Sequence, residues 1–154
     1  MVRYNYYYDK NIREICHEIK KNNLECCEIM ANYFLNQEII KEGDILIPIP
    51  QHNGYSIYTK QIAQLISLQT NAIVEDIIKS KPRETLYELK KQNKKVSLDF
   101  FLAKNLKEIK SNVFLIDNVL DTGQTFFTCR NLLNGINIIP LVYAYTNKNI
   151  LENL

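Results

Sequence analysis

The segment from 112 to 126, NVFLIDNVLDTGQTF, joins an apolar run to residue types that bind sugars and phosphates. Gly123 can turn the backbone so that successive N–H groups converge at the start of a helix, an arrangement that binds phosphate. Hydroxyl donors flank it at Thr122 and Thr125. The predicted phosphate loop consists of Asp121, Thr122, Gly123, Gln124 and Thr125.

Asp117 and Asn118 precede this loop at the end of the apolar run. Their side chains can form hydrogen bonds with vicinal hydroxyl groups, such as those of a ribose. The order of strand, hydroxyl-binding pair, apolar spacer and phosphate loop therefore describes a ribose-5-phosphate site. The alternative is that these polar residues only form a turn and cap a helix. The spacing of the two polar clusters around Val119 and Leu120 favours the ligand site.

Helical spacing of apolar residues alternates with short apolar runs along the chain. Helices are expected over 9–21, with Asp9 as N-cap, from 24 to 35, from 58 onward and over 122–134. Strands are expected over 45–50, 71–78, 112–117 and 137–146, with Pro140 at an edge or a strand start. This alternation predicts an α/β fold with a mostly parallel sheet, whose ligands bind at the carboxyl ends of the strands.

A second loop follows the first long strand and carries polar residues without an evident structural role. It consists of Gln51, His52, Asn53 and Gly54. Because parallel strands end at the same edge of a sheet, this loop and the phosphate loop are expected to lie near each other. An ordinary loop histidine is the alternative for His52.

Basic residues are concentrated between 79 and 95. This segment has seven of them and two acidic residues, Glu84 and Glu88, for a net charge of about +5. They are Lys79, Lys81, Arg83, Lys90, Lys91, Lys94 and Lys95. The whole chain carries +2, so the remainder carries about −3. An anionic ligand is expected near this segment. A nucleic-acid-binding module would also use such charge, but the sequence has no groove-reading motif.

The length of 154 residues and the 46% hydrophobic content fit one soluble domain, spanning 1–154. No apolar run approaches the ~20 residues of a membrane span, and the N-terminus lacks the apolar core of a secretory signal. A cytoplasmic location is the default expectation. The four cysteines form no C-x-x-C pair, so they are predicted to be reduced core residues rather than zinc ligands.

The segment VFLIDNVLDTGQTF closely resembles the PRPP motif of type I phosphoribosyltransferases. The segments YYYDKNIREICHEIK and ILIPIPQH resemble the ComF (competence protein F) family of such proteins. The positions that carry this second resemblance are Tyr8, Asp9, Arg13, Lys20, Pro48, Pro50 and His52. Together the two resemblances span about residues 6 to 146, without the cysteine-rich zinc module that ComF proteins carry at the N-terminus.

The resemblance implies a type I phosphoribosyltransferase fold with a small flexible hood over about 79–103. It implies transfer of the 5-phosphoribosyl group of PRPP to a nucleobase-like acceptor, with Mg²⁺ and release of pyrophosphate. Asp117, helped by Asn118, would hold the ribose hydroxyls and a water on Mg²⁺, and Asp121 would assist proton transfer at the base. The loop 51–54 would bind pyrophosphate.

Four basic hood residues are implied to close over the pyrophosphate: Lys81, Arg83, Lys90 and Lys91. A homodimer is a further implication of the family fold.

Three features depart from the family pattern. Asn118 replaces the usual second acidic residue, and IYTKQ (57–61) replaces R-G-F-N-Q, keeping only Gln61. Asp121 stands where ComF members tend to have threonine. A non-catalytic PRPP- or nucleotide-binding protein associated with DNA-uptake machinery is therefore the alternative to a transferase.

Overall fold

The computed structural model describes residues 6–95, 97–106 and 109–151. The first half of the chain forms β1 (Tyr6–Tyr7), α1 (Lys10–Glu18), the 3-10 helix η1 (Ile19–Lys21), α2 (Leu24–Leu35), β2 (Ile45–Pro48), α3 (Tyr58–Thr70) and β3 (Ile73–Val74). The second half forms β4 (Ile78–Ser80), α4 (Leu86–Lys91), β5 (Phe100–Leu102), β6 (Val113–Leu120), α5 (Gln124–Leu132), β7 (Ile138–Tyr145) and α6 (Lys148–Leu151). None of the helices in these ranges is both long and apolar enough to cross a bilayer.

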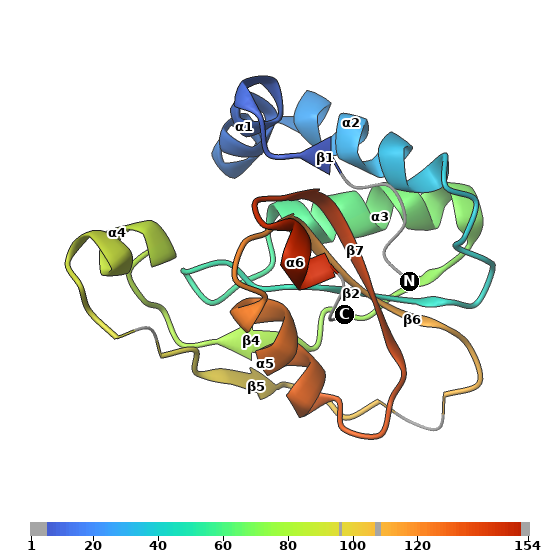
Figure 1. The fold of residues 1–154 in the computed structure, drawn as a ribbon. Coiled ribbons are helices and arrows are strands. Elements are labelled where there is room, and N and C mark those ends of the chain that lie inside the picture. Colours follow the sequence, from blue (N-terminus) through green and yellow to red (C-terminus); the bar gives the residue numbers. More distant parts are fainter. Residues whose placement is uncertain (1–5, 96, 107–108, 152–154) are drawn as a thin grey trace.

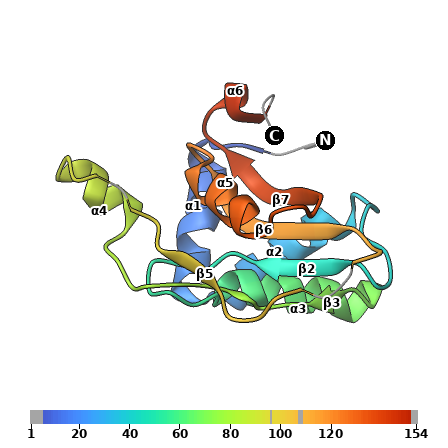
Figure 2. The same ribbon diagram turned by 90° about the horizontal axis from the view of Figure 1, so that it is seen from below.

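Five strands form the main sheet in the order β1-β7-β6-β2-β3, and every pairing in it is parallel. Figures 1 and 2 show α1, α2 and α3 on one side of this sheet and α5 on the other. The predicted α/β architecture, a mostly parallel sheet flanked by helices, is confirmed. The carboxyl ends of β2, β6 and β7 meet at one edge, where the predicted loops leave the sheet.

Each face of the sheet has its own apolar core. Fully buried side chains from α2 and α3, such as Met30, Phe34 and Ile62, pack on one face. Phe126 and Cys129 of α5 pack on the other. All four cysteines are buried and unpaired, as expected for reduced core residues.

The predicted helices are present with small changes at their ends. Asp9 caps α1 through Oδ1, which accepts the N–H of Ile12 at 2.9 Å, and Asn23 caps α2 in the same way. Helix α5 begins at Gln124 rather than Thr122, because Gly123 adopts a left-handed conformation just before it. Polar N-caps and apolar periodicity were therefore sufficient signals for these elements.

The prediction of one strand over 71–78 was wrong. Only Ile73 and Val74 join the main sheet, and Ile78 begins β4 in a separate antiparallel sheet with β5. Between them, Asp76 forms ion pairs with Lys60 and Lys79. The side chain of Asp76 is 19% exposed, and the residue pairs in neither sheet.

The region predicted as the hood contains elements that the sequence pattern did not predict. Strands β4 and β5 form its base, and α4 projects from them beyond the rest of the molecule (Figure 1). Thr85 and Glu88 form a capping box at the start of α4, each side chain accepting the other's backbone N–H. This T-x-x-E signature was available in the sequence.

Strand β7 lies between β6 and β1, although Pro140 suggested an edge or a strand start. Among the described residues, β1 pairs only with Ala144 and Tyr145, at the far end of β7 from Pro140. A proline has no N–H to donate to a neighbouring strand. Because the described part of β1 pairs with β7 away from Pro140, the missing N–H costs no hydrogen bond to it.

Candidate functional site

Asp117 and Asn118 lie within β6, which continues to Leu120 instead of ending at Asp117 as predicted. Asn118 is 5% exposed, and its Oδ1 accepts a hydrogen bond from the hydroxyl of Tyr58 at 3.3 Å. Tyr58 is the first residue of α3 and is itself 7% exposed. Asn118 is therefore built into the core between β6 and α3, and the half-buried Asp117 precedes it on β6, close to the carboxyl edge of the sheet.

The carboxyl of Asp117 sits in an environment that disfavours its charge. Burial raises its pKa to about 6. A 2.8 Å hydrogen bond from the backbone N–H of Asn118 and the positive charge of Lys20 act in the opposite direction without cancelling this effect. A carboxyl with such a pKa changes charge near physiological pH, which is a property of functional sites.

The predicted phosphate loop connects β6 to α5. Gly123 is the N-cap of α5, with φ of +77°, and it makes no side-chain cap. A Cβ atom at this position would lie 2.9 Å from Cε2 of Phe127, so only glycine fits without displacing that ring. The N–H groups in the first turn of a helix have no intrahelical acceptor. Here the N–H of Gln124 donates to Oγ1 of Thr122 at 3.4 Å. Those of Thr125 and Phe126 have no acceptor among the described residues and are available to an anion.

Asp121 does not cap α5, because the cap position belongs to Gly123. One carboxylate oxygen of Asp121 accepts from Nζ of Lys90 at 2.5 Å, and the other accepts from Oγ1 of Thr146 at 2.6 Å. Burial alone would raise the pKa of Asp121, but these two partners outweigh it and hold that pKa below its usual value. The carboxylate thus connects the phosphate loop to the hood and to the end of β7.

The loop 51–54 is attached to the hood by backbone hydrogen bonds. The N–H of Arg83 donates to the carbonyl of His52 at 2.8 Å, and the N–H of Ser80 donates to the carbonyl of Gly54 at 3.2 Å. Gly54 has φ of +95°, and a Cβ there would overlap the carbonyl oxygen of Ser80. Two of the predicted site segments, far apart in sequence, are therefore joined here.

Within this loop, two side chains bond to nearby backbone. Oε1 of Gln51 accepts the N–H of Ile57 at 3.1 Å, and Oδ1 of Asn53 accepts the N–H of Tyr55 at 3.1 Å. The imidazole of His52 is exposed. His52 is thus more exposed than Gln51 and Asn53, which are half-buried.

The four predicted hood cations lie in different environments. Lys81, Lys90 and Lys91 are all exposed, and Lys90 is the one of the three that forms an ion pair with a described residue, Asp121. Arg83 is half-buried; its Nη1 donates to the carbonyl of Glu84 at 3.0 Å, and its Nε is buried without a partner among the described residues. Burial lowers the pKa of Arg83. The structure therefore brings the Lys90 side chain to the phosphate loop and the backbone of Arg83 to the loop 51–54. Among the described residues, no hydrogen bond or ion pair joins the side chain of Lys81 or Lys91 to either loop.

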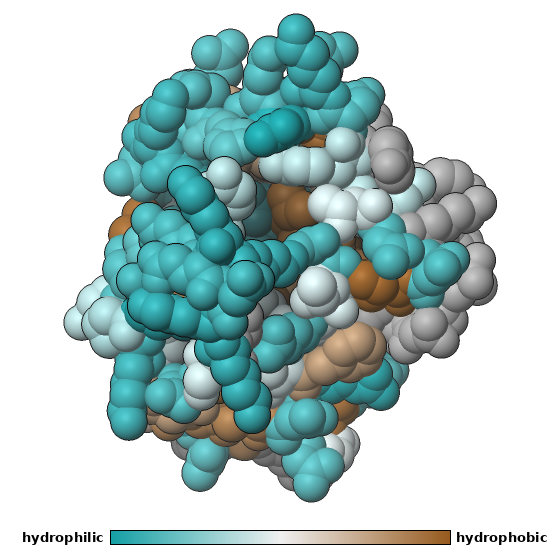
Figure 3. Space-filling model, turned by 60° about the vertical axis from the view of Figure 1, so that its left-hand side comes forward, coloured by the Kyte–Doolittle hydropathy of each residue, from teal (hydrophilic) through white to brown (hydrophobic). Residues whose placement is uncertain are grey.

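Figure 3 looks onto the side from which α4 projects. Hydrophilic side chains dominate this face and border a recess in which apolar atoms are visible. A face of this kind suits a ligand with charged and apolar parts.

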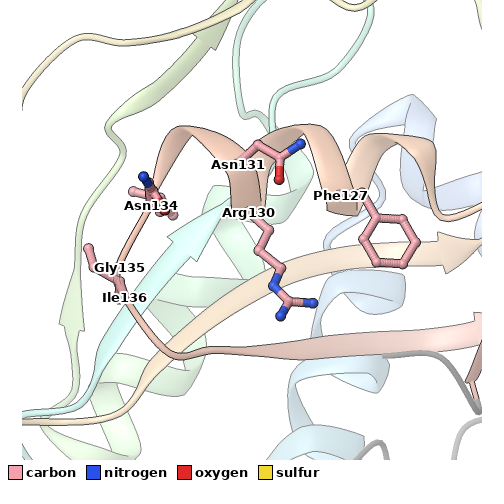
Figure 4. A pocket seen from close by; sticks show the side chains of 7 residues that line it. Phe127, Arg130, Asn131, Asn134, Gly135 and Ile136 are labelled. Carbon is pink, nitrogen blue, oxygen red and sulfur yellow. The ribbon is translucent and has the colours of Figure 1, made fainter.

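A pocket of about 540 Å³ lies at the other end of α5, away from the phosphate loop (Figure 4). Its lining residues are Phe127, Arg130, Asn131, Leu133, Asn134, Gly135 and Ile136. None of them belongs to the predicted site, and Arg130 is the one charged residue among them. Without convergent titratable groups, this pocket is a weaker functional candidate than the sheet edge.

Tyr58, Lys20 and Thr146 take part in the site but were not predicted for these roles. Tyr58 belongs to the segment 57–61, where the chain departs from the ComF pattern, and it contacts Asn118, the other departure. No spacing rule connects these positions, which lie 60 residues apart. Only the packing of α3 against β6 brings them together.

Comparisons with known proteins assign no family to the chain. No protein-family model matches the chain, and no curated protein is found to be related to it. Among solved structures, the chain is similar to a hypoxanthine phosphoribosyltransferase from Staphylococcus aureus, at 14% identity and a TM-score of 0.42. The match covers 90% of this chain and 74% of that one. At these values the likeness assigns neither a family nor a substrate, so the function must be inferred from the site itself.

Within the described ranges, no group of three or more His, Cys, Asp or Glu side chains is arranged to hold a metal ion. Asp117 is the carboxylate of β6, and the oxygen of its neighbour Asn118 already accepts a hydrogen bond from Tyr58. Asp117 is therefore the residue of β6 whose side-chain oxygen can bind a cation. Magnesium is often held by one or two carboxylates together with substrate phosphates and water. This donor set fits an ion that arrives with a diphosphate better than a resident metal.

Proposed function

We propose that the protein is a phosphoribosyltransferase that binds PRPP and transfers its 5-phosphoribosyl group to a nitrogenous base. The observation that carries this proposal is the connection from β6 to α5. There, the half-buried Asp117 and the buried Asn118 are followed by a loop whose glycine caps a helix. A ribose with a 5-phosphate presents hydroxyls and an anion in that same order.

In the proposed reaction, a ring nitrogen of the acceptor forms a bond to C1 of the ribose while the bond from C1 to the pyrophosphate oxygen breaks. The phosphate loop holds the 5-phosphate, and Asp117 with Asn118 orients the ribose. Asp121, kept ionised by its lowered pKa, accepts the proton that the attacking nitrogen loses. The base must first displace Lys90 or approach beside it.

The leaving pyrophosphate needs charge neutralisation. In the proposed complex, the loop 51–54 and Arg83 lie together and supply the imidazole of His52 and the guanidinium of Arg83, whereas the N–H groups of Gln51, Gly54 and Arg83 already donate to backbone carbonyls. Bound Mg²⁺ would neutralise part of the diphosphate charge, and Asp117 is the residue that would hold it, through water. Lys90 and the other hood lysines would limit access of water to the ribose.

The test is release of pyrophosphate from radiolabelled PRPP in the presence of Mg²⁺ and a panel of purine and pyrimidine bases. The proposal expects turnover with at least one base, and loss of that turnover in Asp117→Ala and Gly123→Val. The matched control is Gly135→Val, another glycine of positive φ that lies outside the site. Equal activity in all four proteins would refute the site assignment.

A non-catalytic PRPP- or nucleotide-binding protein, of the kind proposed for DNA uptake, is the second candidate. It is favoured by Asn118, which supplies no second carboxylate and has its oxygen engaged by Tyr58. In that case PRPP would raise the melting temperature without any pyrophosphate release. Appearance of turnover in Asn118→Asp would then identify the missing carboxylate as the cause.

A further inference from the structure

The buried contact between Tyr58 and Asn118 fixes the orientation of the Asn118 amide. The phenol oxygen lies 3.3 Å from Oδ1 of Asn118, and both residues are more than nine-tenths buried. The Nδ2 of the same amide is buried and has no partner among the described residues. One end of the amide is therefore bonded within the protein and the other end is not.

The direction of this hydrogen bond follows from the partners available. A tyrosine hydroxyl can donate or accept, so a flipped amide could in principle donate to it. Asn118 is the only acceptor that the described residues offer to the hydroxyl hydrogen of Tyr58. A flip would leave that hydrogen without an acceptor in a buried place, which is costly. The observed orientation, with Tyr58 donating to Oδ1, satisfies it.

The unpartnered Nδ2 has a consequence for binding. A buried N–H donor without an acceptor is unfavourable, and buried polar groups in proteins are almost always bonded. A ligand that places an acceptor oxygen against Nδ2 removes this deficit. The neighbouring carboxylate of Asp117 accepts hydrogen bonds, so the two side chains together offer one acceptor and one donor. Two adjacent hydroxyls of a sugar match such a pair.

We propose that Tyr58 is a positioning residue that holds the Asn118 amide with its NH2 group toward the ligand. Asn118 then donates a hydrogen bond from Nδ2 to the oxygen of a sugar hydroxyl. The inference rests on the proposed function, because it concerns the ribose part of the same site. The asparagine at 118, which replaces the usual acidic residue of the family pattern, would thus bind the sugar as a hydrogen-bond donor. A carboxylate at that position could only accept hydrogen bonds or bind a cation.

Two variants separate the positioning group from the donor. Tyr58→Phe keeps the NH2 group but removes the hydroxyl that orients it. Asn118→Asp keeps an oxygen for Tyr58 but removes the donor. Tyr87→Phe is the matched control, because Tyr87 is 74% exposed on α4. Affinities for ribose 5-phosphate and for inorganic phosphate are measured by calorimetry in metal-free buffer.

One net hydrogen bond corresponds to about a 2- to 10-fold change in affinity. Tyr58→Phe and Asn118→Asp are expected to weaken the affinity for ribose 5-phosphate by at least this factor. The affinity for inorganic phosphate, which has no hydroxyl-bearing ring, should stay unchanged. Tyr87→Phe should change neither. Equal weakening of both ligands would indicate a general loss of structure and overturn the inference, as would unchanged affinity for ribose 5-phosphate in Tyr58→Phe.

A second measurement keeps the inference separate from the proposed function. The side-chain amide signals of Asn118 are assigned in a ¹H–¹⁵N spectrum by their absence in Asn118→Asp. In ligand-free Tyr58→Phe, these signals should shift or broaden, while the other asparagine signals stay in place. Failure of the wild-type protein to bind either ligand would overturn the proposed function. Unmoved Asn118 signals in Tyr58→Phe would overturn the positioning role whatever the ligand.

Discussion

Replacing Asp117 by asparagine is expected to stabilise the protein at neutral pH while destroying its ligand site. The substitution keeps the size of the side chain and removes a charge that the fold disfavours. Burial raises the pKa of Asp117 from 3.8 to about 6 in the folded chain. The folded state therefore binds this proton more tightly than the unfolded state does.

The sign and size of the effect follow from that difference. A carboxyl with a raised pKa contributes stability that is fully present below about pH 4 and is lost as the pH rises through about 6. Each pKa unit corresponds to about 1.4 kcal/mol, so the full difference is on the order of 3 kcal/mol. Since the side chain is only partly buried, about 1–3 kcal/mol is the expected gain for Asp117→Asn at pH 8.

The assay is urea unfolding of both proteins between pH 4.5 and 8, which gives the free energy of unfolding at each pH. The gain from Asp117→Asn should be smallest at pH 4.5 and should level off above about pH 7. The control is Asp76→Asn. Ion pairs with Lys79 and Lys60 outweigh the burial of Asp76 and lower its pKa. Its contribution is present above about pH 4 and is lost in acid, so Asp76→Asn should destabilise the protein at pH 8.

A constant difference between wild-type and Asp117→Asn across this pH range would refute the reasoning, because an uncharged cause would not titrate. A loss of stability at pH 8 would do the same, since it would mean that the carboxylate is favoured in the fold.

Three further predictions follow from individual contacts. Lys20→Ala should raise the pKa of Asp117 further, as measured by NMR titration of the side-chain carboxyl, because Lys20 now lowers it. Gly54→Ala should lower the free energy of unfolding, measured in urea, by more than the ~1–2 kcal/mol that a left-handed alanine costs, because the added Cβ would overlap the carbonyl oxygen of Ser80. Gly135→Ala, whose added Cβ has no neighbour, should lower it by only about that much. Lys90→Ala should change the free energy of unfolding by less than about 1 kcal/mol, because both partners of its ion pair are half exposed. It should, however, increase hydrogen exchange in α4 more than Lys91→Ala does, since Lys91 makes no ion pair with any described residue.

Local signals in the sequence were sufficient for the main elements. Asp9 and Asn23 are good N-caps before apolar periodicity, and both helices begin where these residues place them. The run 112–117 and the glycine at 123 likewise predicted a strand followed by a turn into a helix. These predictions succeed because caps, periodicity and positive φ depend on residues only a few positions apart.

Predictions over 71–102 were weaker for a physical reason. The segment 71–78 has the composition of a strand, but the ion pairs of Asp76 and the pairing of Ile78 with Leu102 divide it between two sheets. Composition describes what a strand can bury, whereas sheet membership depends on a partner 24 residues away. Helix α4 is a different case, because its capping box is a local signal that lies within four residues of the sequence.

The chemistry at Asp117 to Thr125 was determined by the sequence alone: carboxylate, amide, glycine and hydroxyls in an order that suits a sugar phosphate. Tertiary structure alone decided how those groups are tuned. It buried Asp117 and thereby raised its pKa, placed Lys90 on Asp121, and brought Tyr58 to the oxygen of Asn118. These effects depend on distance and burial between residues that are up to 60 positions apart, and sequence spacing carries no information about either.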